Sequence, residues 1–156
     1  MGIPAKLIDF LNQNKVRYDI LHHPEAFTAQ ELSAIEHVKG RQHAKVVMVN
    51  ANGDKVMAVL SADHRVDLEK LGQVTGRGAA LATETEFKAL FPDCAVGTMP
   101  PFGALYGVET YVEKSLTENE FIVFEAGTHS DAMKMRYADF ERLARPKIAE
   151  FAVIRS

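Results

Sequence analysis

The sequence predicts a mixed α/β fold, α+β-like in character, in place of a doubly wound parallel sheet. Two adjacent β-like runs, 44–50 and 55–60, flank Asn52-Gly53-Asp54, which is a strong signal for a hairpin. The other strand-like runs are mixed with isolated helical segments, whereas a doubly wound sheet requires regular alternation of the two. With 156 residues, 47% of them hydrophobic, the chain is expected to form a single domain over 1–156.

The first half of the chain contains three helical patterns around the hairpin. A helix is expected over 3–14 from its apolar spacing, and a strand over 16–22 from alternation. Thr28 and Glu31 form a capping box that starts a short helix ending before Gly40. A further helix begins at Asp67, with Gly72 and Gly76 near its end.

The second half is read in the same way. Residues 79–82 are expected to form a short strand, and Thr83 and Thr85 are both available to cap a helix over 86–91 that stops at Pro92. The remaining expected elements are strands at 108–113, 121–126, 132–135 and 151–154, a turn at 127–131 and a helix at 137–144. The expected core consists of Leu7, Phe10, Leu11, Ile20, Leu32, Val47, Val49, Val59, Leu68, Leu71, Phe87, Leu90, Ile122, Phe124, Leu143 and Val153.

Composition excludes several classes of protein. The net charge of −3 argues against a protein that coats nucleic acid with a broad basic surface, although a local phosphate contact stays open. A single cysteine, Cys94, cannot form an internal disulfide and fits a reducing compartment. The start of the sequence lacks a signal-peptide pattern, and no apolar run reaches the ~18 residues of a membrane span. We expect a cytoplasmic protein with no membrane partner.

Familiar catalytic motifs are absent. The sequence contains no phosphate-binding Gly-Lys-Ser/Thr loop, no dinucleotide fingerprint and no Gly-x-Ser-x-Gly elbow. The six histidines lack zinc-ligand spacing, so we expect no metal and no cofactor. Cys94 is either a nucleophile or, as is commoner for a lone cysteine, a small buried hydrophobe.

Three local features remain. Lys45 begins an otherwise apolar strand, where a charge must face either water or a binding partner. Gly127-Thr128-His129 directly follows a buried strand, and 97–103 is a stiff loop with Gly97, Gly103 and the pair Pro100-Pro101. Each has an ordinary structural explanation, as a solvated strand end, a strand-end turn or a rigid surface turn. Together they also suit hydrolysis of an ester attached to a phosphate-bearing group, because a lysine can hold phosphate and backbone amides can stabilise a carbonyl oxygen.

The sequence resembles the YbaK and prolyl-tRNA synthetase insertion-domain family of aminoacyl-tRNA editing deacylases. The resemblance extends over nearly the whole chain and rests on the order and spacing of several short motifs. These are His23-Pro24, Thr28-Ala29-Gln30-Glu31, Ala44-Lys45-Val46-Val47, the polar turn and helix at 61–71, Gly97-Thr98-Met99-Pro100-Pro101-Phe102-Gly103, and Ala126-Gly127-Thr128-His129.

The resemblance implies a central mixed, partly barrel-like sheet surrounded by helices. It also implies metal-free hydrolysis, in trans, of an amino acid wrongly esterified to the terminal adenosine of a tRNA, with a synthetase as a further possible partner. By the same resemblance Lys45 contacts the terminal adenosine or its phosphate and helps organise the reaction, and Gly97 and Gly127 lend backbone groups that position the ester and water. The substrate's own hydroxyl replaces a protein base in that scheme. The implied substrate-binding positions are His129, Thr98, Pro100, Pro101, Phe102, Val46 and Thr28.

The identity of the amino acid stays open between alanine, cysteine, serine and threonine. Val46 stands where some alanine-specific members of the family carry asparagine, and Pro100-Pro101 is a variant of the family's loop. One methylene in such a pocket is worth only ~1–3 kcal/mol. Two other functions also stay open: a non-catalytic module that binds aminoacyl ends or acyl metabolites, and an esterase or amidase for free amino-acid derivatives.

Overall fold

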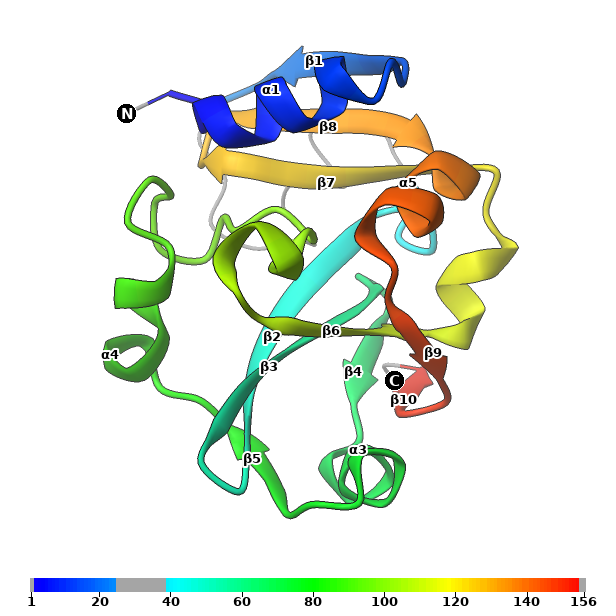
Figure 1. The fold of residues 1–156 in the computed structure, drawn as a ribbon. Coiled ribbons are helices and arrows are strands. Elements are labelled where there is room, and N and C mark those ends of the chain that lie inside the picture. Colours follow the sequence, from blue (N-terminus) through cyan, green and yellow to red (C-terminus); the bar gives the residue numbers. More distant parts are fainter. Residues whose placement is uncertain (1, 25–38, 155–156) are drawn as a thin grey trace.

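A β-hairpin lies at the centre of the protein, as the computed structural model shows for residues 2–24 and 39–154 (Figure 1). Strands β2 (Ala44–Ala51) and β3 (Asp54–Ser61) pair antiparallel over their full length. Asn52 and Gly53 both have positive φ, as the predicted tight turn requires. The hairpin is therefore confirmed, with each strand extended by one or two residues.

The central sheet is mixed. It has five strands in the order β5-β2-β3-β6-β9, in which β5 and β3 run antiparallel to β2 while β6 and β9 are parallel to β3. Its other strands are β5 (Ala79–Leu81), β6 (Glu109–Glu113) and β9 (Lys147–Ala149). The predicted mixed α/β fold class is confirmed.

A second, antiparallel sheet has three strands in the order β1-β8-β7. These are β1 (Tyr18–His22), β7 (Phe121–Thr128) and β8 (Asp131–Arg136). An isolated parallel bridge between His43 and Val123 joins the edge of this sheet to the beginning of β2. A third pair consists of β4 (His64–Val66) and β10 (Ala152–Ile154).

Helices cover these sheets, and most were expected from the sequence. The α-helices are α1 (Ala5–Gln13), α3 (Leu68–Thr75), α4 (Glu84–Phe87) and α5 (Tyr137–Ala144), and the 3₁₀ turns are η1 (Lys88–Leu90), η2 (Gly103–Tyr106) and η3 (Lys114–Glu118). Asp67 caps α3 by accepting from two backbone amides, and Gly76 ends it with φ +71°. The helix expected from Thr28 to Val38 lies outside the described residues.

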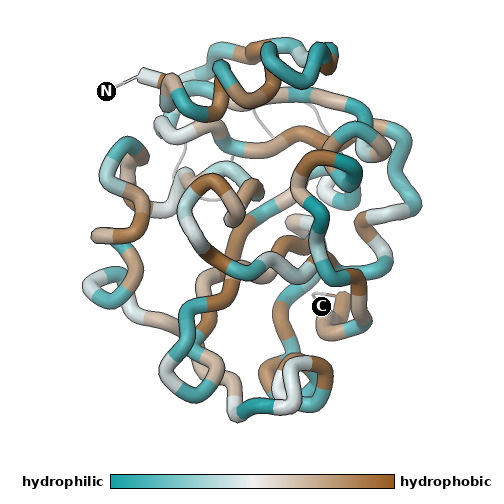
Figure 2. The backbone as a smooth tube through the Cα atoms, viewed as in Figure 1, coloured by the Kyte–Doolittle hydropathy of each residue, from teal (hydrophilic) through white to brown (hydrophobic). Residues whose placement is uncertain are grey.

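The central hairpin is buried on both faces, which explains its almost continuous run of apolar residues. Side chains alternate across a strand, so Val46 and Met48 pack into one core while Val47 and Val49 pack into another. The first core also takes buried side chains of α1, β7, β8 and α5, and the second takes Leu71 of α3 and Phe151. Figure 2 shows hydrophobic positions following β2 and β3 through the middle of the molecule.

Seven of the expected core residues are fully buried: Leu7, Leu11, Val49, Val59, Leu71, Ile122 and Phe124. Ile20 is wrong as a core prediction, since its exposed fraction is 40%. In the described part of the chain no helix is long and apolar enough to cross a membrane.

Candidate active site

The glycine loop and the late glycine turn meet in the structure. The Gly127 amide donates to the Thr98 carbonyl at 2.8 Å, and the Ala95 amide donates to the Gly127 carbonyl at 2.9 Å. Two segments thirty residues apart are therefore held together by paired backbone hydrogen bonds, as a short stretch of sheet would be.

Gly127 lies at an irregularity in β7, where the register with β8 shifts between Glu125 and Thr128. Its φ is +91°, and a Cβ at this position would approach Pro4 Cδ to 2.5 Å. The predicted turn at 127–131 therefore begins later than expected, because Gly127 and Thr128 still belong to the strand as a bulge. The bulge aims the Gly127 amide at the loop.

Gly97 is the exposed apex of that loop. Its φ is +83°, and a Cβ there would meet nothing within 4 Å. No acceptor for the Gly97 amide is found among the described residues, whereas both the amide and the hydroxyl of the neighbouring Thr98 donate to the Ala95 carbonyl, the hydroxyl at 2.6 Å. The Gly97 amide, at the exposed apex of the loop, is thus available to donate to a ligand.

The rest of the loop anchors it in the core. Thr98, Met99, Pro100 and Pro101 are buried. Phe102 is 1% exposed, and its ring makes edge contacts with three other phenylalanines: Phe10, Phe124 and Phe140. The two prolines and this aromatic cluster fix the position of Gly97.

Lys45 lies at the beginning of β2 and is half-buried. Its ammonium donates to the His64 carbonyl at 2.5 Å, across from β4. The His64 ring is in turn held by Asp63, with 2.7 Å between Nδ1 and the carboxylate. Val46, the next residue, points to the opposite face of β2, into the first core. The backbone of β4 therefore gives the Lys45 ammonium a defined direction.

A buried histidine accompanies Lys45. His43 precedes Lys45 by two residues and is 1% exposed, and neither of its ring nitrogens has a hydrogen-bond partner among the residues that can be described. Burial, and then the positive charges of His23 and Lys45, lower the pKa of His43 to about 4. This imidazole is neutral at physiological pH. His43 was not among the residues selected from the sequence. It could have been found there, because residues two apart on a strand lie on the same face, so a strand that starts near Lys45 places His43 beside it.

His23 connects this cluster to the glycine turn. Its backbone amide donates to the Ser130 carbonyl at 3.0 Å, at the tip of the β7–β8 hairpin. The same tip carries the half-buried His129 and is braced by Asp131, which accepts from the Thr128 hydroxyl at 2.7 Å and lies 2.6 Å from His22 Nδ1. Thr28 lies outside the described residues.

Cys94 lies beside Gly127 but is unsuited to nucleophilic attack. It is buried near the Tyr106 hydroxyl, and burial raises the pKa of its thiol to about 11. The thiol stays protonated at neutral pH, so the buried-hydrophobe interpretation holds. Across the ranges that are described, no three His, Cys, Asp or Glu side chains are grouped so as to hold a metal ion.

The described residues thus provide an oriented ammonium and a buried, neutral imidazole at the beginning of β2, and an available glycine amide in the loop beside the β7 bulge, with no activated nucleophile among them. Such a set of groups suits a hydrolase that places a substrate and water and stabilises developing negative charge.

The comparison with protein families agrees with this chemistry. Residues 23–143 match the model of the aminoacyl-tRNA editing domain, so the chain belongs to this family. It is therefore a hydrolase of aminoacyl-tRNA ester bonds, and the site described above lies within the matched region.

Individual proteins show the same relationship. The chain is 28% identical over 152 residues to the multifunctional Ser/Thr-tRNA deacylase ProXp-y of Escherichia coli K12, covering 94% of this chain and 90% of that one. Among solved structures, the hypothetical protein APE2540 superimposes with a TM-score of 0.86 at 17% identity, over 95% of this chain and 99% of the other. A candidate trans-editing enzyme for prolyl-tRNA synthetase superimposes with a TM-score of 0.83 at 19% identity, over 95% of both chains. At 17% and 19% identity, these two superpositions show that the fold is shared.

Proposed function

We propose that this protein acts in trans to remove a small, wrongly attached amino acid from tRNA, with serine and threonine as the foremost substrates among alanine, cysteine, serine and threonine. The family match over the region that holds Lys45, Gly97 and Gly127 carries the proposal. Serine and threonine come first because the Escherichia coli relative is a Ser/Thr-tRNA deacylase.

In the proposed mechanism, Lys45 binds the terminal adenosine or its phosphate. The His64 carbonyl orients the ammonium, and the half-buried setting strengthens its attraction for an anion. The amide of Gly97 donates to the carbonyl oxygen of the ester as negative charge develops there. Gly127 holds the Gly97 loop in place, because its own amide is already bonded to Thr98.

The other predicted residues shape or support the pocket. Thr98, Pro100, Pro101 and Phe102 are buried and keep the loop rigid. His129 and Thr28 are assigned to the acyl pocket, and Val46 remains a proposed determinant of its size. A hydroxyl of the substrate assists the attacking water, in agreement with the protonated Cys94 thiol.

We further propose that the reaction takes place in the cytoplasm, with an aminoacyl-tRNA synthetase as a partner that presents the mischarged tRNA. Pull-down of synthetases by the purified protein in the presence of tRNA tests this partner. If no synthetase is retained, the proposed partner is wrong and the protein binds its tRNA without one.

The decisive experiment measures amino-acid release from tRNAs charged with alanine, cysteine, serine or threonine. We expect release with at least one of them, and a loss of about 10- to 100-fold in kcat/KM for Lys45→Ala, because a charged hydrogen bond to the substrate is worth about 1.5–3 kcal/mol. Lys70→Ala, on the exposed surface of α3, is the matched control and should keep full activity.

Two outcomes would contradict the proposal. Absence of release from every tRNA, with binding retained, would favour a non-catalytic module. Equal turnover of free amino-acid esters and charged tRNA would favour a general esterase. In each case the melting temperature of Lys45→Ala shows whether the variant is folded.

A further inference from the structure

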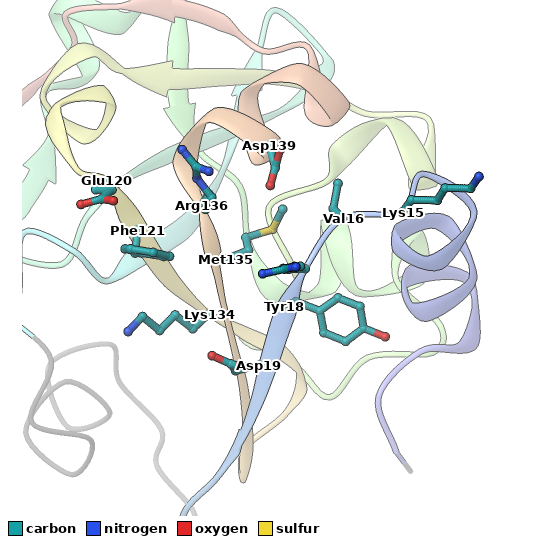
Figure 3. Close-up of a pocket in the computed structure, with 11 residues that line it drawn as sticks. Lys15, Val16, Tyr18, Asp19, Glu120, Phe121, Lys134, Met135, Arg136 and Asp139 are labelled. Atoms are coloured by element: carbon teal, nitrogen blue, oxygen red, sulfur yellow. The ribbon is translucent and has the colours of Figure 1, made fainter.

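A groove of about 530 Å³ lies at the end of the three-stranded sheet opposite to Gly127. It is formed by the segment between α1 and β1, by β1 and β8, and by the beginnings of β7 and α5 (Figure 3). Its lining residues are Lys15, Val16, Arg17, Tyr18, Asp19, Glu120, Phe121, Lys134, Met135, Arg136 and Asp139.

Cations gather in this groove although the protein as a whole is acidic. Lys15, Arg17, Lys134 and Arg136 are all exposed, and none of the four forms an ion pair with a carboxylate of the described chain. Three carboxylates also line the groove, but that of Asp139 already pairs with Arg142 at 3.4 Å. The net charge of the whole chain is −3, so this cluster is a local exception.

Two aromatic rings accompany the cations. The Lys134 ammonium lies 5.0 Å from the centre of the Phe121 ring, and the Tyr18 hydroxyl donates to the Asn12 side chain at 2.9 Å. Figure 3 shows these rings on either side of Met135. A concave surface with cations and half-buried aromatic side chains is typical of sites that follow an RNA backbone and its unpaired bases.

Strands lead directly from the groove to the candidate active site. β1 begins at Tyr18 in the groove and ends at His22, next to His23. β7 begins at Phe121 in the groove and reaches Gly127 six residues later, a distance of about 20 Å at strand spacing. The unpaired 3′ end of a tRNA and the first pairs of its acceptor stem can bridge such a distance.

We infer that this groove, and in particular Arg17 and Arg136, binds the phosphate backbone of the tRNA acceptor arm while the aminoacylated end occupies the site at Lys45 and Gly97. The inference rests on the proposed function and names the surface that holds its substrate. An acidic chain needs such a local cation cluster, because phosphate neutralisation supplies most of the affinity of proteins for nucleic acids.

The test compares Arg17→Gln/Arg136→Gln with the control Lys70→Gln/Lys88→Gln. Both double variants remove two charges from exposed side chains, and the control residues lie on α3 and η1, outside the lining of the groove. The probe is a labelled, uncharged RNA minihelix with an unpaired NCCA end, and anisotropy gives its Kd over a series of KCl concentrations.

For Arg17→Gln/Arg136→Gln we expect Kd to rise about tenfold at low salt. The slope of log K against log salt should fall by about 1.5 to 2, because two phosphates are no longer neutralised by the protein. Hydrolysis of seryl-adenosine, a minimal substrate that carries no backbone phosphate for the groove to bind, should stay within twofold of the wild-type rate. The control variant should match the wild type in every measurement.

A second groove variant makes the groove more positive and completes the experiment. Asp19→Asn/Glu120→Gln removes two carboxylates from the groove, so the minihelix should bind more tightly and with a steeper dependence on salt. Unchanged minihelix binding by both groove variants, or equal losses in the groove and control variants, would overturn the inference. The binding of labelled polyglutamate is measured in the same way. Weaker polyglutamate binding by Arg17→Gln/Arg136→Gln with unchanged RNA binding would also overturn the inference, since it would assign the groove to an acidic protein partner.

The two proposals fail separately. If the wild type hydrolyses charged tRNA but the groove variants bind RNA normally, the groove inference is wrong and the deacylase proposal stands. If no charged tRNA is hydrolysed but the Arg17/Arg136 variant loses RNA binding, the groove is an RNA surface and the deacylase proposal is wrong.

Discussion

Gly127 shows how much a single residue can decide in this protein. Its positive φ forms the bulge in β7, its lack of a side chain admits Pro4, and its amide holds the loop at Thr98. The late glycine turn was identified from the sequence as a feature of interest. Its part in fixing the loop depends on Pro4 and Thr98, which are far away in sequence.

We therefore expect Gly127→Ala to destabilise the protein by about 2–3 kcal/mol, through steric overlap with Pro4 and through positive φ. Gly107→Ala is the matched control: its φ is +70°, but a Cβ there would meet nothing within 4 Å, so a cost of about 1 kcal/mol is expected. Urea denaturation of the two variants measures the difference. Equal losses would show that Pro4 imposes no constraint.

At the scale of elements, helix α4 illustrates a choice between two caps. Thr83 and Thr85 were equally available in the sequence. In the structure the Thr83 hydroxyl accepts from the Glu86 amide, and the Glu86 carboxylate accepts from the Thr83 amide, which completes a capping box. The Asn50 side chain also donates to Glu86, so the pKa of this carboxyl falls to about 2.

Thr83→Ala should therefore lower the free energy of unfolding by about 1 kcal/mol, the usual cost of losing an N-cap. Thr85→Ala, two positions further on and also exposed, should change it by less than about 0.5 kcal/mol. Thermal and urea unfolding measure both effects. A larger loss for Thr85→Ala than for Thr83→Ala would contradict the assignment of the cap.

Elements with a strong pattern of their own were predicted, and those defined by a distant partner were not. The β2–β3 hairpin and helix α5 follow from turn residues and apolar spacing within a few residues. Strands β4 and β9 have three residues each and were missed, because they exist through pairing with β10 and β6. A three-residue run carries little periodicity of its own, and the two other strands of this length, β5 and β10, were predicted only within slightly longer apolar runs.

At the scale of the whole molecule, the buried His43 connects the candidate site to global stability. Its pKa of about 4 lies below the ordinary 6.5, so the unfolded chain takes up a proton before the folded protein does. Stability is fully present above pH 6.5 and falls as the pH drops towards 4. For this one group the loss amounts to about 3 kcal/mol.

His43→Leu should accordingly flatten the dependence of unfolding free energy on pH between 6.5 and 4. At pH 7 the variant should be at least as stable as the wild type, because two ring nitrogens that have no hydrogen-bond partner in the described part of the chain are replaced by an apolar side chain. Urea denaturation at several pH values gives both results. An equally steep loss of stability in the two proteins over this range would contradict the burial of a neutral imidazole.

The sequence by itself determined the mixed α/β class, the central hairpin, the family, and the three places that carry the proposed chemistry: Lys45, the loop at Gly97 and the turn at Gly127. These depend on short-range patterns and on motifs whose order is visible along the chain. Only the tertiary structure decided that the two glycine segments are hydrogen-bonded together, that the His64 carbonyl orients Lys45, and that His43 lies buried beside it. The physical reason is that these are contacts between residues far apart in sequence, and burial and hydrogen bonding at such contacts are set by how the sheets pack.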